Sequence, residues 1–339
     1  MGHYLVAMTN GENVGFGLGQ RGFSLTVDKV WSGKTVDYPT FIDALQHYLR
    51  EHDLQTRDMD SFALAVSGIP SGDVLSIANC RWYLSVSGIR SFLRTEPLIL
   101  NEFVASAWAL TALDRSKFLT IGTHAPRPIV PGSTFLIVGV GFNLGVATLH
   151  ITRDGQIVAL ESQGGHGSFA PQTAADDAIL PYLRRRFGHV SYEHILSDSG
   201  LETVYQALAD SEGKSVTAPP TAQIITAGRQ RSDPIAVNAL RVFTSTLGSF
   251  IGSQALSAGA WDGVFVTGAT VHDVTTSLTQ ADFRNHMTSK GTAAKLLDKV
   301  PVAYLNHDYV RLLGCSAALA ARETFNQPEL DRPRLAAGG

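Results

Sequence analysis

The chain has 339 residues, of which 44% are hydrophobic and 17% charged, and its formal net charge is −3 at pH 7. This apolar content supports sizeable cores and excludes a disordered chain, and the slightly acidic balance argues against general binding to a nucleic-acid backbone. Its two cysteines, Cys80 and Cys315, are too few for a disulfide framework or a four-cysteine metal site. The length indicates about two domains, at roughly 150 residues each.

From the sequence we expect neither a membrane span nor a signal peptide. Charged and polar residues interrupt the first thirty positions, and the longest apolar stretch, residues 135–149, is broken by glycines and Asn143. That stretch is also too short to cross a bilayer. We therefore expect a soluble, cytoplasmic protein without a membrane partner.

The first third of the chain alternates between predicted strands and helices. Residues 4–8 and 14–18 are apolar runs around a Gly/Asn-rich turn, which predicts a strand, a tight turn and a second strand. Residues 39–52 have helical periodicity, with Pro39 at the first helical position. Two buried strands and an Ala-rich helix are predicted next, over residues 61–68, 98–100 and 104–113.

The opening pattern returns about 130 residues later. Residues 135–138 predict a strand, 139–143 a glycine turn and 144–151 a second strand. Helices are predicted over residues 175–187, 191–210, 233–258 and 310–325, and strands over 263–267 and 301–306. The chain thus consists of two similar α/β halves, and such a duplication usually encloses a ligand in the cleft between them.

The glycine turns do not match the common nucleotide motifs. Gly139, Gly141 and Gly145 lead into β-like sequence, whereas a dinucleotide fingerprint needs a helix N-terminus there. Gly33-Lys34-Thr35 lacks the upstream glycine of a Walker A loop. Backbone N–H groups of a Gly-rich turn can nevertheless bind an anion. A single such turn reads as an ordinary tight turn, but two in duplicated positions favour a phosphate-binding role.

Several stretches resemble, in the same order, motifs of the bacterial glucokinase family, over about residues 3 to 325. They are Asn79 with Trp82, Leu100-Asn101-Glu102-Phe103, Gln163-Gly164-Gly165-His166 with Phe169-Ala170-Pro171, Gly188-His189-Val190-Ser191-Tyr192-Glu193, Gly263-Val264-Phe265 with Gly268, and Leu312-Leu313-Gly314. The resemblance implies a duplicated actin-like or hexokinase-like (ribonuclease H-like) α/β fold of two domains with a central cleft.

The resemblance also implies domain limits and an activity. We expect a small α/β domain over residues 1–112 plus 313–327, a large α/β domain over 113–312, and a flexible tail over 328–339. The family transfers the γ-phosphate of ATP, with Mg²⁺, to the 6-hydroxyl of glucose. A cytoplasmic homodimer that closes around the sugar is implied as well.

Two groups of site residues follow from the resemblance. The predicted hexose-binding residues are Asn79, Asn101, Glu102, Gln163, His166 and Glu193. The predicted nucleotide-binding residues are Gly11, Asn13, Gly139, Gly141 and Gly268. Carboxylates, amides and imidazole suit sugar hydroxyls, which both donate and accept, and Glu102 is the expected base for the attacking hydroxyl. No protein metal ligand is predicted.

Three of these residues also have an alternative interpretation that involves no ligand. His166 is read otherwise as a structural histidine, Glu193 as a water-exposed carboxylate on a helix face, and Glu102 as a charge favoured by a helix N-terminus. His189 and His194 are five residues apart, which is wrong for two metal ligands on one helical face.

The sugar motifs depart conservatively from the family pattern. Glu102 stands where the family has Asp, so the carboxylate remains but its reach changes. A misplacement of about 1 Å can cost roughly a hundredfold in rate. Gln163 stands where the family has Glu, and it keeps hydrogen bonding while losing the charge.

The phosphate motifs depart more severely. Met8 replaces an Asp expected near the metal, Glu12 a hydroxyl that should approach phosphate, and Gly15 an Arg. In the second turn Phe142 and Asn143 replace Thr and Gly, and Ala269 replaces a glycine of the adenosine segment. A carboxylate about 4 Å from a phosphate charge costs roughly 4 kcal/mol at an effective dielectric constant near 20, or about three decades in affinity. A compensating role for Glu12 as a Mg²⁺ ligand stays open.

Three functional hypotheses follow. The first is a hexose-binding regulator or sensor whose ATP-dependent 6-phosphotransfer is weak or lost. The alternative is an active, divergent ATP:D-glucose 6-phosphotransferase that feeds glycolysis. The third is an interaction protein that uses only the scaffold.

Overall fold

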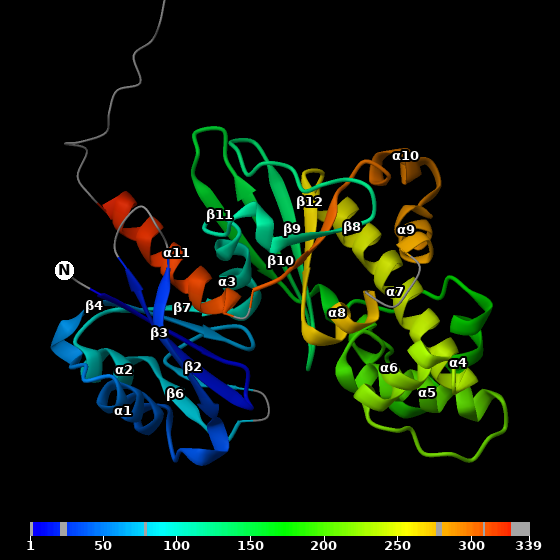
Figure 1. Ribbon diagram of the computed structural model, residues 1–339, viewed down its shortest axis with the longest axis horizontal. Helices are drawn as coiled ribbons and strands as arrows, with labels where there is room; N and C mark the ends of the chain where they lie inside the picture. The colour runs from blue at the N-terminus through cyan, green and yellow to red at the C-terminus, as the bar shows by residue number, and fades with distance from the viewer. Residues whose placement is uncertain (1–2, 21–25, 78–79, 276–279, 308, 327–339) are drawn as a thin grey trace, which may run out of the picture. The chain divides into compact units, whose positions relative to one another are not determined.

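The computed structural model describes residues 3–20, 26–77, 80–275, 280–307 and 309–326. The chain divides into two compact units, which are described separately (Figure 1). Unit 1 comprises Met1–Leu113 and Tyr309–Gly339, and unit 2 comprises Asp114–Asp308.

Unit 1 is built on a five-stranded mixed sheet in the order β3-β2-β1-β4-β7. Its strands are β1 (His3–Thr9), β2 (Asn13–Gln20), β3 (Val27–Lys34), β4 (Met59–Val66) and β7 (Pro97–Asn101). The pairs β1–β2 and β2–β3 are antiparallel, and β1–β4 and β4–β7 are parallel. The predicted strand–turn–strand opening is confirmed. A hairpin of β5 (Val74–Ser76) and β6 (Tyr83–Ser85) stands apart from this sheet.

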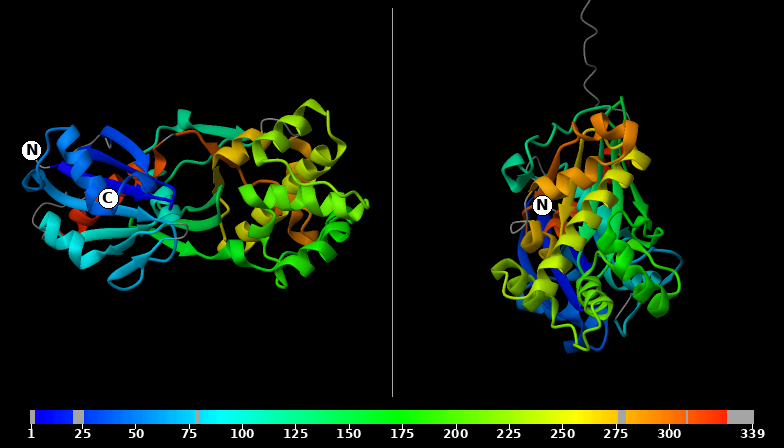
Figure 2. Two further views of the ribbon diagram at one scale, coloured as in Figure 1. Left: turned by 90° about the horizontal axis from the view of Figure 1, so that it is seen from below. Right: turned by 90° about the vertical axis from the view of Figure 1, so that its right-hand side faces the viewer.

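Helices cover both faces of the unit 1 sheet because its central strands are apolar on both sides. Leu5 and Ala7 of β1 pack with α1 (Phe41–Glu51) and α2 (Val86–Leu93). The alternate residues Tyr4 and Val6 pack with α3 (Glu102–Ala109) and α11 (Val310–Asn326). Figure 2 shows from two further directions that α11, from the end of the chain, lies against the strands from its beginning.

Capping side chains set two helix starts that the sequence analysis misplaced. Pro39 is not helical, because Thr40 is the N-cap of α1 and its side chain accepts from the Asp43 amide. The helix predicted from residue 104 begins at Glu102, because the Asn101 side chain caps it.

Unit 2 repeats the same sheet plan. Its strands are β8 (Phe118–Ile121), β9 (Thr134–Val140), β10 (Leu144–Ile151), β11 (Ile157–Ser162), β12 (Gly263–Thr267) and β13 (Val302–Leu305). They lie in the order β11-β10-β9-β12-β13-β8, with the pairs β9–β10 and β10–β11 antiparallel and β9–β12 and β12–β13 parallel. The predicted duplication is confirmed, and β8 adds an antiparallel edge strand.

The helices of unit 2 pack into one large core with this sheet. They are α4 (Ala174–Phe187), α5 (Asp198–Ser211), α6 (Thr221–Gln230), α7 (Pro234–Ala258), α8 (Ala269–Thr275), α9 (Gln280–Thr288) and α10 (Ala294–Leu297). Of the helices in the described ranges, only α7 is long and apolar enough to cross a membrane, and 83% of its most apolar stretch is buried inside the protein. It is therefore packed as a core helix, against α5, α6 and α9.

The single helix predicted over residues 191–210 is wrong. A 3₁₀ turn, η5 (Tyr192–His194), comes first, and α5 begins only after Ser197, whose hydroxyl caps it by accepting from the Gly200 amide. The other short 3₁₀ turns are η1 (Thr35–Asp37), η2 (Thr56–Asp58), η3 (Arg115–Lys117), η4 (Gly164–His166) and η6 (Gly291–Ala293).

Candidate functional site

The first glycine turn joins β1 to β2 and uses most of its own amide groups. The Asn10 amide donates to the Asn13 carbonyl at 3.2 Å, and the Asn13 amide donates to Asn10 Oδ1 at 2.9 Å. Gly11 has φ +95° and its amide donates to Thr9 Oγ1 at 3.4 Å. Few donors of this turn therefore remain for a phosphate.

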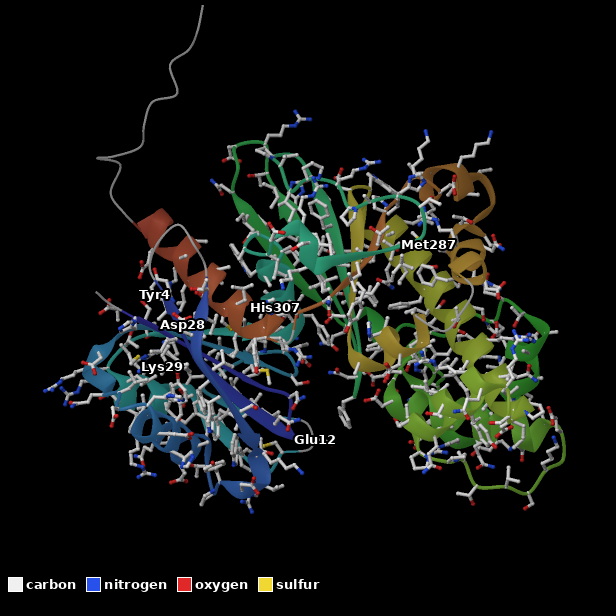
Figure 3. The ribbon with its side chains drawn as sticks, viewed as in Figure 1. Tyr4, Glu12, Asp28, Lys29, Met287 and His307 are labelled. Atoms are coloured by element: carbon white, nitrogen blue, oxygen red, sulfur yellow. The ribbon has the colours of Figure 1, made fainter. Side chains whose placement is uncertain are left out.

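Thr35, which directly follows β3, closes the same turn. Its buried hydroxyl donates to the carbonyl oxygens of Gly11 and Glu12, at 2.6 and 3.1 Å. Glu12 itself is exposed, and Figure 3 marks it at the tip of the β1–β2 hairpin. The turn is thus fixed in place and presents a carboxylate.

Two of the unusual residues in this hairpin accommodate one another. Met8 and Gly15 are register partners across β1 and β2. A Cβ atom added to Gly15 would lie 3.3 Å from Met8 Cγ, which is tight contact. The apolar Met8 side chain therefore lies against the position where the family pattern has Arg, and it provides no oxygen ligand for a metal.

The second glycine turn, between β9 and β10, is shorter than predicted. Gly139 lies inside β9, where it is paired with Gly145 on one side and Thr267 on the other, so it is not in the turn. The turn comprises Gly141, Phe142 and Asn143, and the Gly141 amide donates to the Asn143 carbonyl at 3.1 Å. Phe142 is 48% exposed, so a bulky apolar side chain stands where the family pattern has a hydroxyl.

Hydrogen bonds connect this second turn to the start of α5 and to the segment after β12. The Asp198 amide donates to the Gly141 carbonyl at 2.8 Å, and the Asp198 carboxylate accepts from the Thr270 hydroxyl. Gly268, with φ +119°, has its Cα directly against the Val140 carbonyl oxygen, which a Cβ atom would overlap. The structure thus brings Gly141 and Gly268 together within unit 2.

Several amides of these two turns are already engaged. Of their amides, those of residues 10, 11, 13 and 141 already donate within the turns. Among the described residues, no cluster of three or more His, Cys, Asp or Glu side chains is placed to hold a metal ion.

Asn101 has a structural role in unit 1. Its Oδ1 accepts from the amides of Phe103 and Val104, at 2.8 and 3.3 Å, and its Nδ2 donates to the Gly68 carbonyl at 2.8 Å. The side chain is buried and most of its hydrogen-bonding capacity is used. Asn101 therefore holds together the ends of β4 and β7 and the start of α3.

Glu102 is buried and ion-paired. The residue is only 2% exposed, and Arg311 Nη2 lies 2.8 Å from its Oε2. Arg311 is in the first turn of α11, about 200 positions after Glu102 in the sequence. The carboxylate predicted as a base is thus buried and paired with a guanidinium.

In unit 2 the structure brings three of the predicted hexose-binding residues onto neighbouring turns. Gln163 precedes η4, His166 ends it, and Glu193 lies in η5, which contacts η4. Glu193 Oε1 lies 3.9 Å from His166 Nδ1, and Glu193 Oε2 accepts from the Leu144 amide at 3.0 Å. The alternative reading of Glu193 as a carboxylate on a helix face is wrong, because η5 is a 3₁₀ turn.

Glycines make this arrangement possible. A Cβ atom on Gly165 would overlap the Leu144 carbonyl oxygen, so η4 approaches the start of β10 as closely as backbone allows. Gln163 and His166 remain exposed. An exposed imidazole, an exposed amide and a half-buried carboxylate therefore lie on these neighbouring turns, and such groups suit polyol recognition. Asn79 lies outside the described residues.

His194 holds η5 in place in its neutral form. Its ring stacks on Phe187 with 3.8 Å between the ring centroids, and its Nδ1 accepts from the Ser191 amide at 3.2 Å. An accepting Nδ1 carries no proton. Burial lowers the pKa of His194 below its ordinary 6.5, against the opposing charge of Glu193.

This lowered pKa predicts a pH dependence of stability. Below pH 6.5 the unfolded chain binds the His194 proton more readily than the folded chain, so the free energy of unfolding falls as the pH drops. His194→Asn keeps an acceptor for the Ser191 amide but cannot be protonated. Urea unfolding of both proteins between pH 8 and 5 is expected to show a smaller loss in the variant. Parallel curves would contradict this account of His194.

Three residues that hold these elements in place carry no recognisable signal in the sequence: Arg311 and Thr35 in unit 1, and Asp198 in unit 2. Thr35 and Asp198 lie no more than 72 positions from their partners, Gly11 and Thr270. Arg311 is far more distant in the sequence from its partner, Glu102. Only the fold brings such pairs together, and no local motif marks them.

A family profile and individual relatives both match this chain to glucokinases. The glucokinase family profile matches residues 9–322. The chain is 34% identical over 320 residues to the bifunctional protein glk of Burkholderia lata, covering 94% of this chain and 49% of that protein. It is 35% identical to a glucokinase of Chromobacterium violaceum, over 84% of this chain and 80% of the relative. The chain therefore spans about half the length of the Burkholderia relatives that it matches.

Solved structures share the fold. A glucokinase from an Antarctic psychrotroph aligns with a TM-score of 0.81 and 27% identity, over 94% of this chain and 99% of that chain. A glucokinase from Balamuthia mandrillaris in complex with glucose aligns with a TM-score of 0.77 and 18% identity, over 95% and 94%. The predicted hexokinase-like α/β fold is confirmed.

Proposed function

Because the chain belongs to the glucokinase family, we propose that it binds glucose or a similar hexose and that its ATP-dependent 6-phosphotransfer is weak. The observation that carries this proposal is the buried ion pair of Glu102 with Arg311. A general base must reach the attacking hydroxyl, and this carboxylate is buried and already engaged by a guanidinium.

Hexose binding is supported by the polar groups of unit 2. Gln163, His166 and Glu193 offer donors and acceptors on adjoining turns, and two of the three are exposed. Glu193 also holds the Leu144 amide, so its carboxylate is positioned before a ligand arrives. Preorganised polar groups of this kind bind sugar hydroxyls without a large ordering cost.

Weak handling of the nucleotide is supported by the two turns. Phe142 is exposed on one, Glu12 is exposed on the other, and Met8 offers no oxygen. Bound in such a site, ATP with Mg²⁺ would supply the phosphoryl group and the charge that offsets its oxygens. The residues present do not fit that complex, so we assign no catalytic step to it.

The second candidate function is that of an active glucokinase, feeding glycolysis. The observation that favours it is the exposed Glu12 carboxylate at the tip of the hairpin, which is an oxygen ligand available to Mg²⁺.

Cytoplasmic location and a homodimer are proposed on the family resemblance, and sedimentation of the purified chain tests the dimer.

Calorimetry and a coupled ADP-release assay separate the two candidates. We expect glucose to bind, Mg·ATP to bind weakly, and turnover with glucose to stay below about 1 s⁻¹, the low end of ordinary enzyme rates. His166→Ala is expected to weaken glucose binding about tenfold. Turnover above that rate supports the active enzyme, and a chain that binds no hexose at all contradicts both.

Reversal of the turn substitutions provides a sharper test. Glu12→Thr combined with Phe142→Thr removes one charge and one bulky ring beside the expected phosphates. We expect Mg·ATP affinity to rise about tenfold or more. This is less than the roughly three decades estimated for a carboxylate about 4 Å from a phosphate charge, because both side chains are solvated. Tyr83→Thr, which removes an exposed aromatic ring from β6, is the matched control. Equal affinities in all three proteins would contradict the assignment of the turns.

A further inference from the structure

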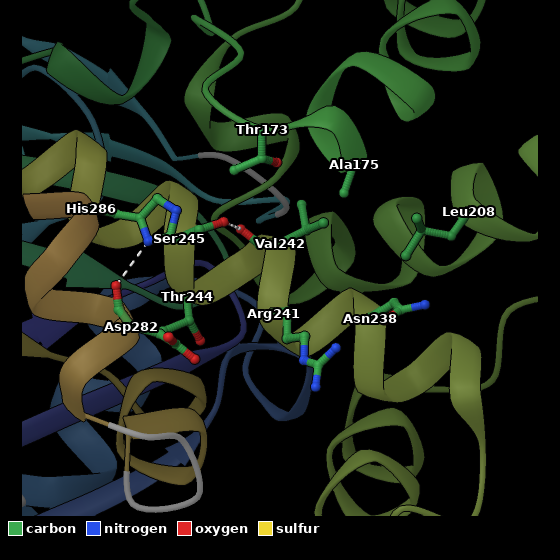
Figure 4. A pocket seen from close by; sticks show the side chains of 10 residues that line it. All are labelled: Thr173, Ala175, Leu208, Asn238, Arg241, Val242, Thr244, Ser245, Asp282 and His286. Atoms are coloured by element: carbon green, nitrogen blue, oxygen red, sulfur yellow. Dashed lines mark hydrogen bonds between the residues drawn. The ribbon is translucent and has the colours of Figure 1, made fainter. Parts of the chain in front are cut away.

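Unit 2 contains a concave site made by other residues than those discussed above. It is a pocket of about 510 Å³ between α7, α9, the start of α4 and the end of α5 (Figure 4). None of its lining residues belongs to the predicted hexose-binding or nucleotide-binding groups. The volume lies in the range of pockets that hold small molecules.

One side of this pocket accepts hydrogen bonds. The hydroxyls of Thr244 and Ser245 donate their own protons to the carbonyls of Leu240 and Val242, at 2.8 and 3.0 Å. Both side chains are buried, and only their lone pairs are left for a ligand. These two oxygens therefore suit a ligand that carries hydroxyl donors.

His286 contributes an acceptor to the same side. Its Nδ1 lies 2.8 Å from the Asp282 carbonyl oxygen, so in the neutral ring Nδ1 carries the proton. The other nitrogen, Nε2, is then an acceptor. Figure 4 shows His286, Thr244 and Ser245 toward one end of the pocket, with Arg241 and Asn238 toward the other.

The other side of the pocket carries donors and a positive charge. Arg241 and Asn238 are one turn apart on α7, and within the described ranges neither side chain makes a hydrogen bond or ion pair with the protein. A guanidinium binds carboxylate or phosphate oxygens strongly. The Asp282 carboxylate lines the His286 end, where it favours hydroxyls and disfavours an anion, so the anionic group belongs at Arg241.

The apolar lining restricts the ligand further. Ala175, Leu208 and Val242 provide aliphatic surface for carbon-bound hydrogens, and the described lining residues include no Phe, Tyr or Trp on which a nucleobase could stack. From Asn238 to Ser245 the pocket follows α7 for about 10 Å at 1.5 Å per residue. We propose that this pocket binds a monosaccharide bearing one anionic group, either a sugar phosphate or a sugar acid.

The test is calorimetry on the full chain in the presence of saturating glucose, which keeps the proposed hexose site filled. The probes are glucose 6-phosphate, gluconate and inorganic phosphate. We expect at least one of the two anionic sugars to bind more tightly than inorganic phosphate, and the tighter of the two identifies the anionic group.

Arg241→Ala is expected to weaken that binding about tenfold or more, the effect of losing a charge-assisted hydrogen bond. Arg229→Ala, which removes an exposed arginine from the last turn of α6, is the matched control and is expected to leave it unchanged. Thermal unfolding verifies that both variants fold. Absence of binding by both sugars, binding no tighter than that of phosphate, or equal losses in the two variants would each overturn the proposal. Failure of the nucleotide experiment leaves this test unaffected, because none of its readouts is turnover. If glucose fails to bind, Arg241→Ala still separates the two sites, because Arg241 is not one of the predicted hexose-binding residues.

Discussion

Replacing Arg311 with methionine is expected to lower the free energy of unfolding by about 3 kcal/mol. The variant leaves the Glu102 carboxylate buried without the guanidinium that lies 2.8 Å from it. Removal of one partner of a buried ion pair typically costs about 3–5 kcal/mol, and we take the low end because the Arg311 side chain is 27% exposed. Urea unfolding followed by circular dichroism measures the change.

Two further variants show whether the cause is the loss of this ion pair. Glu102→Gln combined with Arg311→Met removes both charges and is expected to recover most of the loss. Arg90→Met breaks the exposed ion pair with Glu96 and is expected to cost less than about 1 kcal/mol. If Arg311→Met costs no more than Arg90→Met, the ion pair is not an important element of unit 1.

Gly314→Ala is expected to destabilise unit 1 by a similar amount, about 3 kcal/mol. Gly314 lies where α11 crosses α3, and an added Cβ atom would overlap the carbonyl oxygen of Ala105. The obstacle is backbone, which cannot move aside as a flexible side chain does, so the two helices must separate. Such a shift also displaces Arg311 from Glu102, since these residues lie on the same two helices.

Gly141→Ala is the matched control for this prediction. A Cβ atom on Gly141 meets no atom within 4 Å, and its φ lies outside the positive range that disfavours other residues. We expect its free energy of unfolding to stay within about 0.5 kcal/mol of the parent. A Gly314→Ala protein as stable as Gly141→Ala would show that α3 and α11 are packed less closely than the structure indicates.

The sequence by itself determined the architecture. Apolar runs at residues 4–8 and 14–18, repeated at 135–138 and 144–151, predicted the two hairpins that open each sheet. The signal is local because side chains of buried strands and helices follow the period of their own element. Strands β3 and β11 escaped prediction because, as edge strands, they combine exposed and half-buried residues and carry no continuous apolar run.

The tertiary structure alone decided the state of the candidate site. The sequence motifs identified Asn101, Glu102, His166 and Glu193, but not that Asn101 serves as a helix cap or that Glu102 is paired with Arg311. The glycine pattern predicted a turn at Gly139, whereas Gly139 lies in the middle of a sheet. Whether a carboxylate acts as a base depends on burial and on the charge beside it. Both are set by residues far away in the chain, which only folding brings into contact.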